Sequence, residues 1–122
     1  MWSEKYNYFN VQFDLNFSQK IEKSIVVKYL TDINLFQQIN HQTFRNSEDF
    51  PWVEILLIET YDGNYSTSEK ENEFVTLIAI VTSKEQVNNQ EKYIETFKQI
   101  ALSLNWRLFL EEDDEGNLNI EL

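Results

Sequence analysis

The chain has 122 residues, and its 21 acidic and 10 basic side chains give a formal net charge of -11 at pH 7. A hydrophobic fraction of 42% and an aromatic fraction of 15% are enough to build a core. This composition favours a folded chain with a single domain over residues 1–122. The aliphatic runs at residues 55–58 and 77–81 are far shorter than the roughly 20 residues of a membrane-spanning helix.

The sequence also restricts where the protein acts and what it binds. No basic region followed by an apolar stretch opens the chain, so we expect a cytoplasmic protein. The chain has no cysteine, which excludes disulfides and thiolate metal sites. The surplus negative charge repels nucleic-acid phosphates and anionic lipid headgroups, so we expect direct binding to neither nucleic acid nor membrane.

The first predicted strand covers residues 9–17, where apolar and polar residues alternate. This is the period of a strand with one buried face and one solvated face. The solvated face is expected to consist of Asn10, Gln12, Asp14 and Asn16.

A helix is predicted after Ser18, a candidate N-cap. Apolar residues recur there every three or four positions, as they do along one face of a helix; they are Ile21, Ile25, Tyr29, Ile33 and Phe36. The alternative is a β-branched strand over residues 24–30, paired with the first strand and followed by a shorter helix from Asp32. Residues 40–50 are mostly polar and end before Pro51, which predicts a loop.

Two antiparallel strands are predicted at residues 52–61 and 74–82, which are dense in Val, Ile, Leu and aromatic residues. The polar stretch between them contains the turn-forming residues Asp62, Gly63 and Asn64. Because the second run is apolar at nearly every position, we expect it in the centre of the sheet.

The sequence Ser-Lys-Glu-Gln at residues 83–86 fits a capping box and predicts the start of a second helix. Asn105 is expected to end this helix. Residues 106–110 and 118–122 then predict a terminal hairpin, with a turn at residues 111–117. The apolar face of the helix is expected to consist of Tyr93, Ile94, Phe97, Ile100, Ala101 and Leu104.

The predicted order of strand, helix, strand, strand, helix and strand is that of the ferredoxin-like split β-α-β fold, with one additional C-terminal strand. We therefore expect an α+β sandwich with an antiparallel sheet and both helices on one face. This fold carries many unrelated functions, so it does not by itself indicate an activity.

No combination of residues predicts catalysis. His41 is the single histidine and lies in a predicted polar loop, without a partner at the spacing of a catalytic triad or a zinc site. Two glycines leave no phosphate-binding loop. We therefore predict that the protein is not an enzyme and has no cofactor or metal. The aromatic residues at the amino end are expected to cap the core or to lie at an interface, rather than to stack on bases; they are Trp2, Tyr6, Tyr8 and Phe9. Trp52 and Trp106, which begin predicted strands, are expected to pack under the ends of the sheet.

The acidic residues carry the one binding site that the sequence predicts. Residues 111–115 are all acidic, but their spacing does not match that of an EF-hand loop. In the split β-α-β fold, residues 48–49 emerge at the same end of the sheet, so the two groups would form one anionic surface. The predicted partner-binding residues are Glu48, Asp49, Glu111, Glu112, Asp113, Asp114 and Glu115.

From these features we expect a small acidic binding protein that blocks a basic protein partner, such as a toxin nuclease. Bacterial immunity proteins are similar in kind, being small, acidic, cytosolic and free of catalytic motifs. The alternative is a homodimeric regulatory or ligand-sensing domain of the same fold, and a small enzyme is less favoured. An enzyme would require a deep pocket with strongly shifted carboxyl pKa values.

Overall fold

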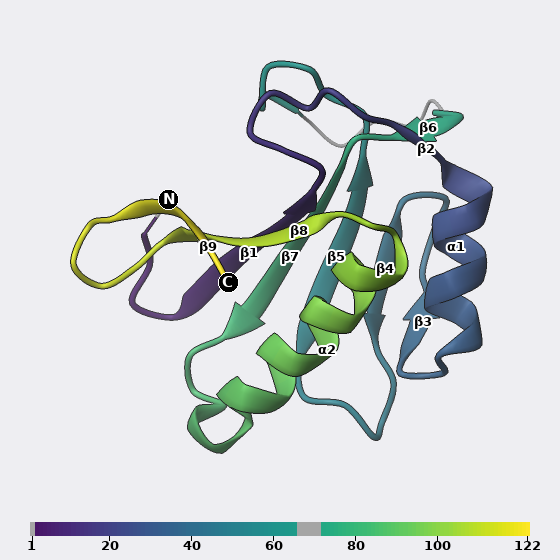
Figure 1. Ribbon diagram of the computed structural model, residues 1–122. Helices are drawn as coiled ribbons and strands as arrows, with labels where there is room; N and C mark the ends of the chain where they lie inside the picture. The colour runs from purple at the N-terminus through teal and green to yellow at the C-terminus, as the bar shows by residue number, and fades with distance from the viewer. Residues whose placement is uncertain (1, 66–71) are drawn as a thin grey trace.

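A seven-stranded antiparallel sheet with two α-helices makes up most of the computed structural model, which describes residues 2–65 and 72–122 (Figure 1). The helices are α1 (Lys23–Asp32) and α2 (Gln90–Ser103), and a short 3-10 helix, η1 (Val87–Asn89), precedes α2. The strands are β1 (Tyr6–Gln12), β2 (Ile21–Glu22), β3 (Phe36–Gln38), β4 (Thr43–Asn46), β5 (Val53–Ile58), β6 (Phe74–Val75), β7 (Leu77–Ser83), β8 (Arg107–Glu112) and β9 (Leu118–Glu121).

The α+β class predicted from the sequence is confirmed, but there are more strands than the sequence indicated. The strand order in the large sheet is β3-β4-β5-β7-β1-β8-β9. A separate two-stranded sheet pairs β2 with β6. The additional strands are short, and they come from segments whose composition did not favour a strand. Residues 66–71 of the predicted connection between β5 and β7 lie outside the described residues.

β1 begins and ends earlier than the strand predicted over residues 9–17. Asp14 ends it, because its carboxylate accepts hydrogen bonds from the backbone N–H groups of Asn16 and Ser18, both at 3.1 Å. Phe17 follows with a φ of 54°, a left-handed conformation that interrupts an extended chain. The alternation of apolar and polar residues therefore continues past the point at which the strand stops.

β7 lies in the middle of the sheet, as its continuous apolar run predicted. It pairs with β5 on one side and β1 on the other, and the antiparallel pairing with β5 confirms the expected relation of those two strands. Ile78 and Ile80 are buried on the side of the helices, whereas Leu77 and Ala79 are buried on the opposite side. A strand with both faces covered requires apolar residues at consecutive positions.

α1 confirms a helix in this part of the chain, but it is shorter than predicted, because Ile21 lies in β2 and Phe36 in β3. The alternative strand over residues 24–30 is wrong. The residue before the helix is Glu22, so Ser18 does not cap it. The fully buried positions are Val26 and Leu30, while Ile25 is 52% exposed. The helix is thus rotated by about one position from the predicted stripe. The reason is that α1 packs beside the edge strand β3 and the small β2-β6 sheet, rather than lying flat across the central strands.

The β3-β4 hairpin occupies chain that the sequence partly predicted as a loop. It pairs through β4 with β5 and so extends the large sheet at one edge. Phe36 and Phe44 are buried in the core, while Gln38 and Arg45 are exposed. An edge hairpin buries one face only, so half of its residues are polar. These polar residues made the segment resemble a loop in composition. The loop predicted for residues 40–50 is therefore wrong over Thr43–Asn46.

α2 presents the predicted apolar face, with Tyr93, Phe97 and Ile100 fully buried. It also ends where predicted. Asn105 adopts the left-handed backbone conformation, with a φ of 57°, and the Trp106 N–H donates to the Ala101 carbonyl at 2.8 Å. Many α-helices end with a residue in this conformation and with this hydrogen bond.

The start of α2 differs from the prediction, because Ser83 is the last residue of β7 and the capping box at residues 83–86 does not form. α2 begins instead at Gln90. The Gln90 side chain donates hydrogen bonds to the Ser83 and Gln86 carbonyls at 3.2 and 3.0 Å. These bonds hold the beginning of the helix against the end of β7.

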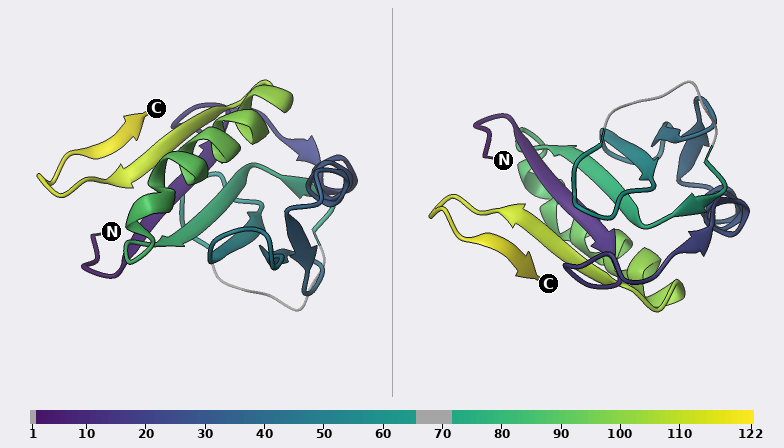
Figure 2. Two further views of the ribbon diagram at one scale, coloured as in Figure 1. Left: turned by 90° about the horizontal axis from the view of Figure 1, so that it is seen from below. Right: turned by 90° about the horizontal axis from the view of Figure 1, so that it is seen from above.

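One core lies between the sheet and both helices. Figure 2 shows α2 crossing the sheet over β1 and β8, and the ring of Phe9 is 5.4 Å from that of Phe97 between centroids. Val26 and Leu30 of α1 belong to the same buried cluster. A smaller cluster of Ile58, Leu77 and Ala79 lies on the opposite sheet face, covered by Phe17. In the described part of the chain, neither helix has both the length and the apolar character needed to cross a bilayer.

Candidate functional site

The predicted partner-binding residues lie at one end of the sheet. One group is next to β5 and the other is at the end of β8, and the strands β7 and β1 lie between them. Glu48 and Asp49 are exposed and precede β5, while residues 111–115 include the end of β8 and the turn that follows. β5, β7, β1 and β8 are successively antiparallel, so the start of β5 and the end of β8 lie at the same end. That the two groups act as one surface stays a prediction.

Asp113 organises the turn at residues 113–117, which closes the terminal hairpin as predicted. Its carboxylate accepts hydrogen bonds at 2.9 Å from the Glu115 N–H, the Asn117 N–H and the Asn117 side-chain amide. These bonds, led by the one from the Asn117 side chain, lower the pKa of Asp113. A carboxylate engaged in this way serves the turn, and it has little capacity left for a partner.

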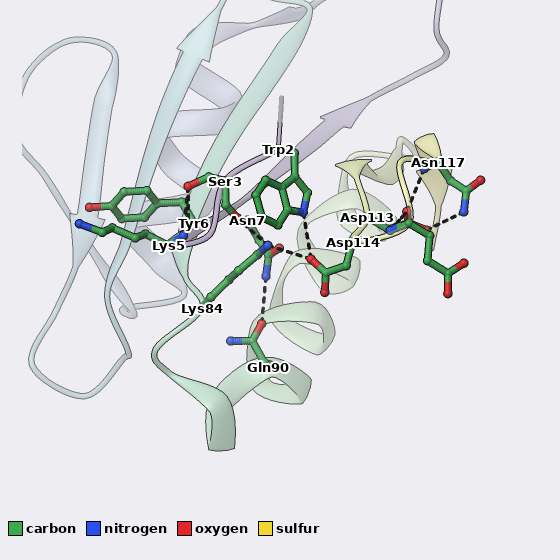
Figure 3. Close-up of polar contacts among 11 residues, drawn as sticks. Trp2, Ser3, Lys5, Tyr6, Asn7, Lys84, Gln90, Asp113, Asp114 and Asn117 are labelled. Atoms are coloured by element: carbon green, nitrogen blue, oxygen red, sulfur yellow. Dashed lines mark hydrogen bonds and ion pairs between the residues drawn. The ribbon is translucent and has the colours of Figure 1, made fainter.

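Asp114 is held in a polar cluster with Trp2 and Lys84 (Figure 3). The Lys84 Nζ lies 3.0 Å from Asp114 Oδ1, and the Trp2 indole N–H donates to the same oxygen at 3.1 Å. The Lys84 Nζ also donates to the Ser3 carbonyl at 2.6 Å and lies 4.7 Å from the centroid of the Trp2 ring. The hydrogen bond from Lys84, followed by that from Trp2, lowers the pKa of Asp114. The cluster joins the amino-terminal segment to the terminal hairpin.

The other three acidic residues of this segment have different surroundings. Glu111 is half-buried and lines a groove on the sheet face opposite α2. Glu112 is also half-buried and pairs with Leu118 in the β8-β9 ladder. Glu115 is exposed at the tip of the turn. The structure therefore separates the five consecutive acids into residues of the strand, the turn and the exposed tip.

Three of the aromatic residues singled out in the sequence are exposed, although Trp52 was expected to pack under the end of the sheet. Trp106 and Phe9 are buried as expected, but Trp2 is 45%, Tyr6 39% and Trp52 40% exposed. The rings of Tyr6 and Trp52 lie 5.7 Å apart between centroids. Sequence reasoning missed this pair because Tyr6 and Trp52 are far apart in the chain, and only the pairing of β5 and β1 with β7 brings them together.

The backbone beneath Trp52 is fixed by the core. The hydroxyl of the buried Tyr93 donates to the Trp52 carbonyl at 2.6 Å. The side chain of Asn46 also bonds both flanks of the loop, donating to the Phe50 carbonyl at 3.2 Å and accepting from the Val53 N–H at 3.3 Å. Residues 47–52 therefore present Glu48, Asp49 and Trp52 from an ordered loop. We use the name acidic end for the exposed residues at this end of the sheet, which are Trp2, Tyr6, Glu48, Asp49, Trp52, Asp114 and Glu115. Two lysines lie among them, Lys84 on Asp114 and Lys92, whose Nζ donates to the Asp49 carbonyl at 3.4 Å.

His41 lies in the short connection between β3 and β4 and is half-buried. Its Nδ1 is 3.5 Å from the Lys23 Nζ. Within residues 2–65 and 72–122, no three His, Cys, Asp or Glu side chains converge in a way that could hold a metal ion. His41 thus belongs to a contact between the β3-β4 hairpin and the start of α1.

Comparison with known proteins gives no relative for this chain: no protein-family model, no curated protein and no solved structure matches it.

Proposed function

We propose that the protein is a small cytoplasmic binding protein that blocks a basic protein partner, such as a toxin nuclease, by docking its acidic end on that partner. The observation that carries this proposal is the contact between the rings of Tyr6 and Trp52, both more than one third exposed, at the end of the sheet where Glu48 and Asp49 are also exposed. Tyr and Trp are enriched among the residues that dominate binding energy at protein interfaces.

The charge of the chain supports the same kind of partner. A net charge of -11 attracts a basic surface over long range and raises the rate of encounter. The active site of a nuclease is built to attract phosphate, so exposed carboxylates can occupy the same cleft through charge-assisted hydrogen bonds. The aromatic pair would then supply buried contact area at the centre of the interface.

We also infer that β8, β1, β7 and β5, together with α1 and α2, form a ferredoxin-like split β-α-β core. The strand order β8-β1-β7-β5 within the sheet supports this inference, as does the alternation of these strands with the two helices along the chain. In this scheme the β3-β4 hairpin adds to one edge and β9 to the other. The acidic end would then lie where the loop before β5 and the turn after β8 leave the sheet of this ferredoxin-like core.

The test begins with capture of a basic protein from the source cell at low ionic strength, and its release at high ionic strength. For the identified partner, we expect the charge-reversed double variant Glu48→Lys, Asp49→Lys to lower the affinity at low salt by about tenfold or more, mainly through slower association. Trp52→Ala should also weaken the complex, mainly through faster dissociation. If the partner is a nuclease, the protein should inhibit it, and each variant should inhibit it less.

The matched control is the double variant Glu22→Lys, Asp32→Lys, which makes the same change in net charge at the two ends of α1. We expect it to change the affinity by less than about twofold, apart from a general salt-dependent effect. Equal losses of affinity for both double variants would overturn the acidic end as the docking surface. The homodimeric alternative is distinguished by sedimentation of the isolated protein, which we expect to be monomeric.

A further inference from the structure

Lys84 lies at the acidic end, although its positive charge opposes the attraction of a basic partner. This charge is compensated within the protein, because the Lys84 Nζ lies 3.0 Å from the Asp114 carboxylate and donates to the Ser3 carbonyl at 2.6 Å. The Lys84 side chain is 21% exposed, whereas that of Asp114 is 79% exposed. An ammonium group so far removed from water requires acceptors of this kind. The contacts therefore indicate that Lys84 acts on other residues of the acidic end.

The segment that Lys84 holds lies beyond the sheet. The ladder between β1 and β7 begins at Tyr6, so residues 2–5 precede it. Lys84 follows the last residue of β7, and its backbone N–H donates to the Lys5 carbonyl at 2.9 Å. Its Nζ donates to the Ser3 carbonyl in the same segment. One lysine thus fixes the segment at two points.

The same cluster fixes the indole of Trp2. The Trp2 Nε1–H donates to Asp114 Oδ1 at 3.1 Å, and this oxygen also accepts from Lys84. The Lys84 Nζ lies 4.7 Å from the centroid of the Trp2 ring, which is within the range of a cation–π contact. Figure 3 shows the indole and the Lys84 side chain both directed toward Asp114. Trp2 is nevertheless 45% exposed, so one part of the ring is held while another part is open to solvent.

A tryptophan that is held in place and partly exposed is suited to bind a protein partner. Trp is among the residue types that dominate binding energy at interfaces. A side chain that is already ordered loses less entropy when a partner covers it. Trp2 would then add a third aromatic ring to those of Tyr6 and Trp52 at the acidic end.

We propose that Lys84 is a positioning residue for partner binding, which holds residues 2–5 against the terminal hairpin so that Trp2 serves as an anchor in the interface. This inference rests on the proposed function for the partner itself. Charge alone predicts that removal of a lysine from an acidic surface strengthens the binding of a basic protein. If Lys84 positions Trp2, the same removal weakens the complex.

The first test is the variant Lys84→Met, which keeps a long unbranched side chain and removes its charge. With the basic protein captured at low ionic strength, we expect association at least as fast as that of the unchanged protein, because repulsion is reduced. Dissociation should be about tenfold faster, because the Trp2 anchor is no longer ordered. The matched control Lys98→Met removes the same charge from an exposed position of α2 and should change the affinity by less than about twofold. An affinity of Lys84→Met equal to or above that of the unchanged protein would overturn the proposal.

A double-mutant cycle shows whether Lys84 acts through Trp2. We expect Trp2→Ala to weaken the complex at least as much as Lys84→Met does. The double variant Trp2→Ala, Lys84→Met should bind no more weakly than Trp2→Ala alone, because the lysine then has no anchor to position. If the two losses of affinity multiply instead, Lys84 acts independently of Trp2 and the positioning role is wrong.

The order of the Trp2 indole is measured in the isolated, isotope-labelled full chain. The chain has three tryptophans, and we expect the indole N–H of Trp2 to have an order parameter of about 0.8. In Lys84→Met this value should fall below about 0.6, while Trp52 and Trp106 keep theirs. Lys98→Met should leave all three unchanged. A Trp2 indole that stays ordered without Lys84 would overturn the proposal, whichever partner binds.

Partner binding separates the two proposals. If Glu48→Lys, Asp49→Lys weakens the complex while Lys84→Met and Trp2→Ala leave it unchanged, the positioning role is wrong and the proposed function stands. If no basic protein binds the unchanged chain, the proposed function is wrong, and the anchor role of Trp2 fails with it.

Discussion

Neighbouring acidic residues of the terminal hairpin differ in what they do for the folded protein. Asp113 accepts three hydrogen bonds within its own turn, whereas Asp114 bonds to Lys84 and Trp2 from other parts of the chain. Glu115 is exposed at the tip. The identity of the residue types was plain from the sequence. Their separate roles follow from the direction in which each side chain leaves the turn.

Replacement of Asp113 by alanine is expected to lower the free energy of unfolding at pH 7, because three N–H donors of the turn lose their acceptor. Since the folded state lowers the pKa of Asp113, its ionised form contributes stability that is fully present above the ordinary pKa of an aspartate. This contribution is lost as the pH falls through the lowered, folded-state pKa. Urea unfolding of both proteins between neutral and strongly acidic pH measures the difference.

The control for this experiment is Glu115→Ala, which removes the same charge from the same turn but leaves the acceptor of residue 113 in place. Its free energy of unfolding should stay close to that of the unchanged protein at every pH. If the two variants lose equal stability at pH 7, or if the Asp113→Ala deficit persists unchanged in acid, Asp113 does not organise the turn through its charged form.

At the scale of elements, a long periodic pattern predicted that an element exists and of which type it is, but not its bounds, and short elements were missed. α2 has four buried residues on one face and was predicted with its apolar face and its end. The two-residue strands β2 and β6 have no room for a period, and the polar β3-β4 hairpin resembles a loop in composition. Helix starts also differed from expectation, because Ser18 and Ser83 fit N-cap positions that the folded chain does not use.

The end of α2 depends on the left-handed conformation of Asn105, at a φ of 57°. We expect Asn105→Gly to keep or slightly raise the free energy of unfolding, because glycine adopts this conformation without steric cost. Asn105→Val should lower it by about 1–2 kcal/mol, since a β-branched residue is strained there. Chemical denaturation measures both. The control Leu102→Val, at an exposed position of the last turn, should cost at most about 0.5 kcal/mol. Equal effects at the two positions would show that Asn105 has no special role.

For the whole molecule, the net charge of -11 opposes the compact state through repulsion between like charges. The ion pairs among the described residues do little against this repulsion, because at least one side chain of each pair is more than half exposed. In the Lys28–Asp32 pair, for example, the two side chains are 77% and 61% exposed. The molecule is therefore expected to be more stable when its charges are screened.

We expect the midpoint of thermal unfolding to rise when sodium chloride is increased from about 20 mM to about 300 mM, since the Debye length then falls well below the distance across the sheet. Calorimetry or circular dichroism measures the midpoint, with choline chloride as a second salt to separate screening from specific ion effects. A midpoint that falls with both salts would mean that favourable ion pairs outweigh the repulsion.

The sequence by itself determined the features that depend on neighbouring residues: the α+β class, the central position of β7, the apolar face of α2, the closing hairpin and the negative charge. Tertiary structure alone decided which face of α1 is buried, that Thr43–Asn46 joins the sheet, and that Tyr6 meets Trp52 while Lys84 meets Asp114. The physical reason is that periodicity reports the local alternation between core and solvent. The partners of a side chain depend on strand register and helix rotation, which are fixed only when distant segments pack together.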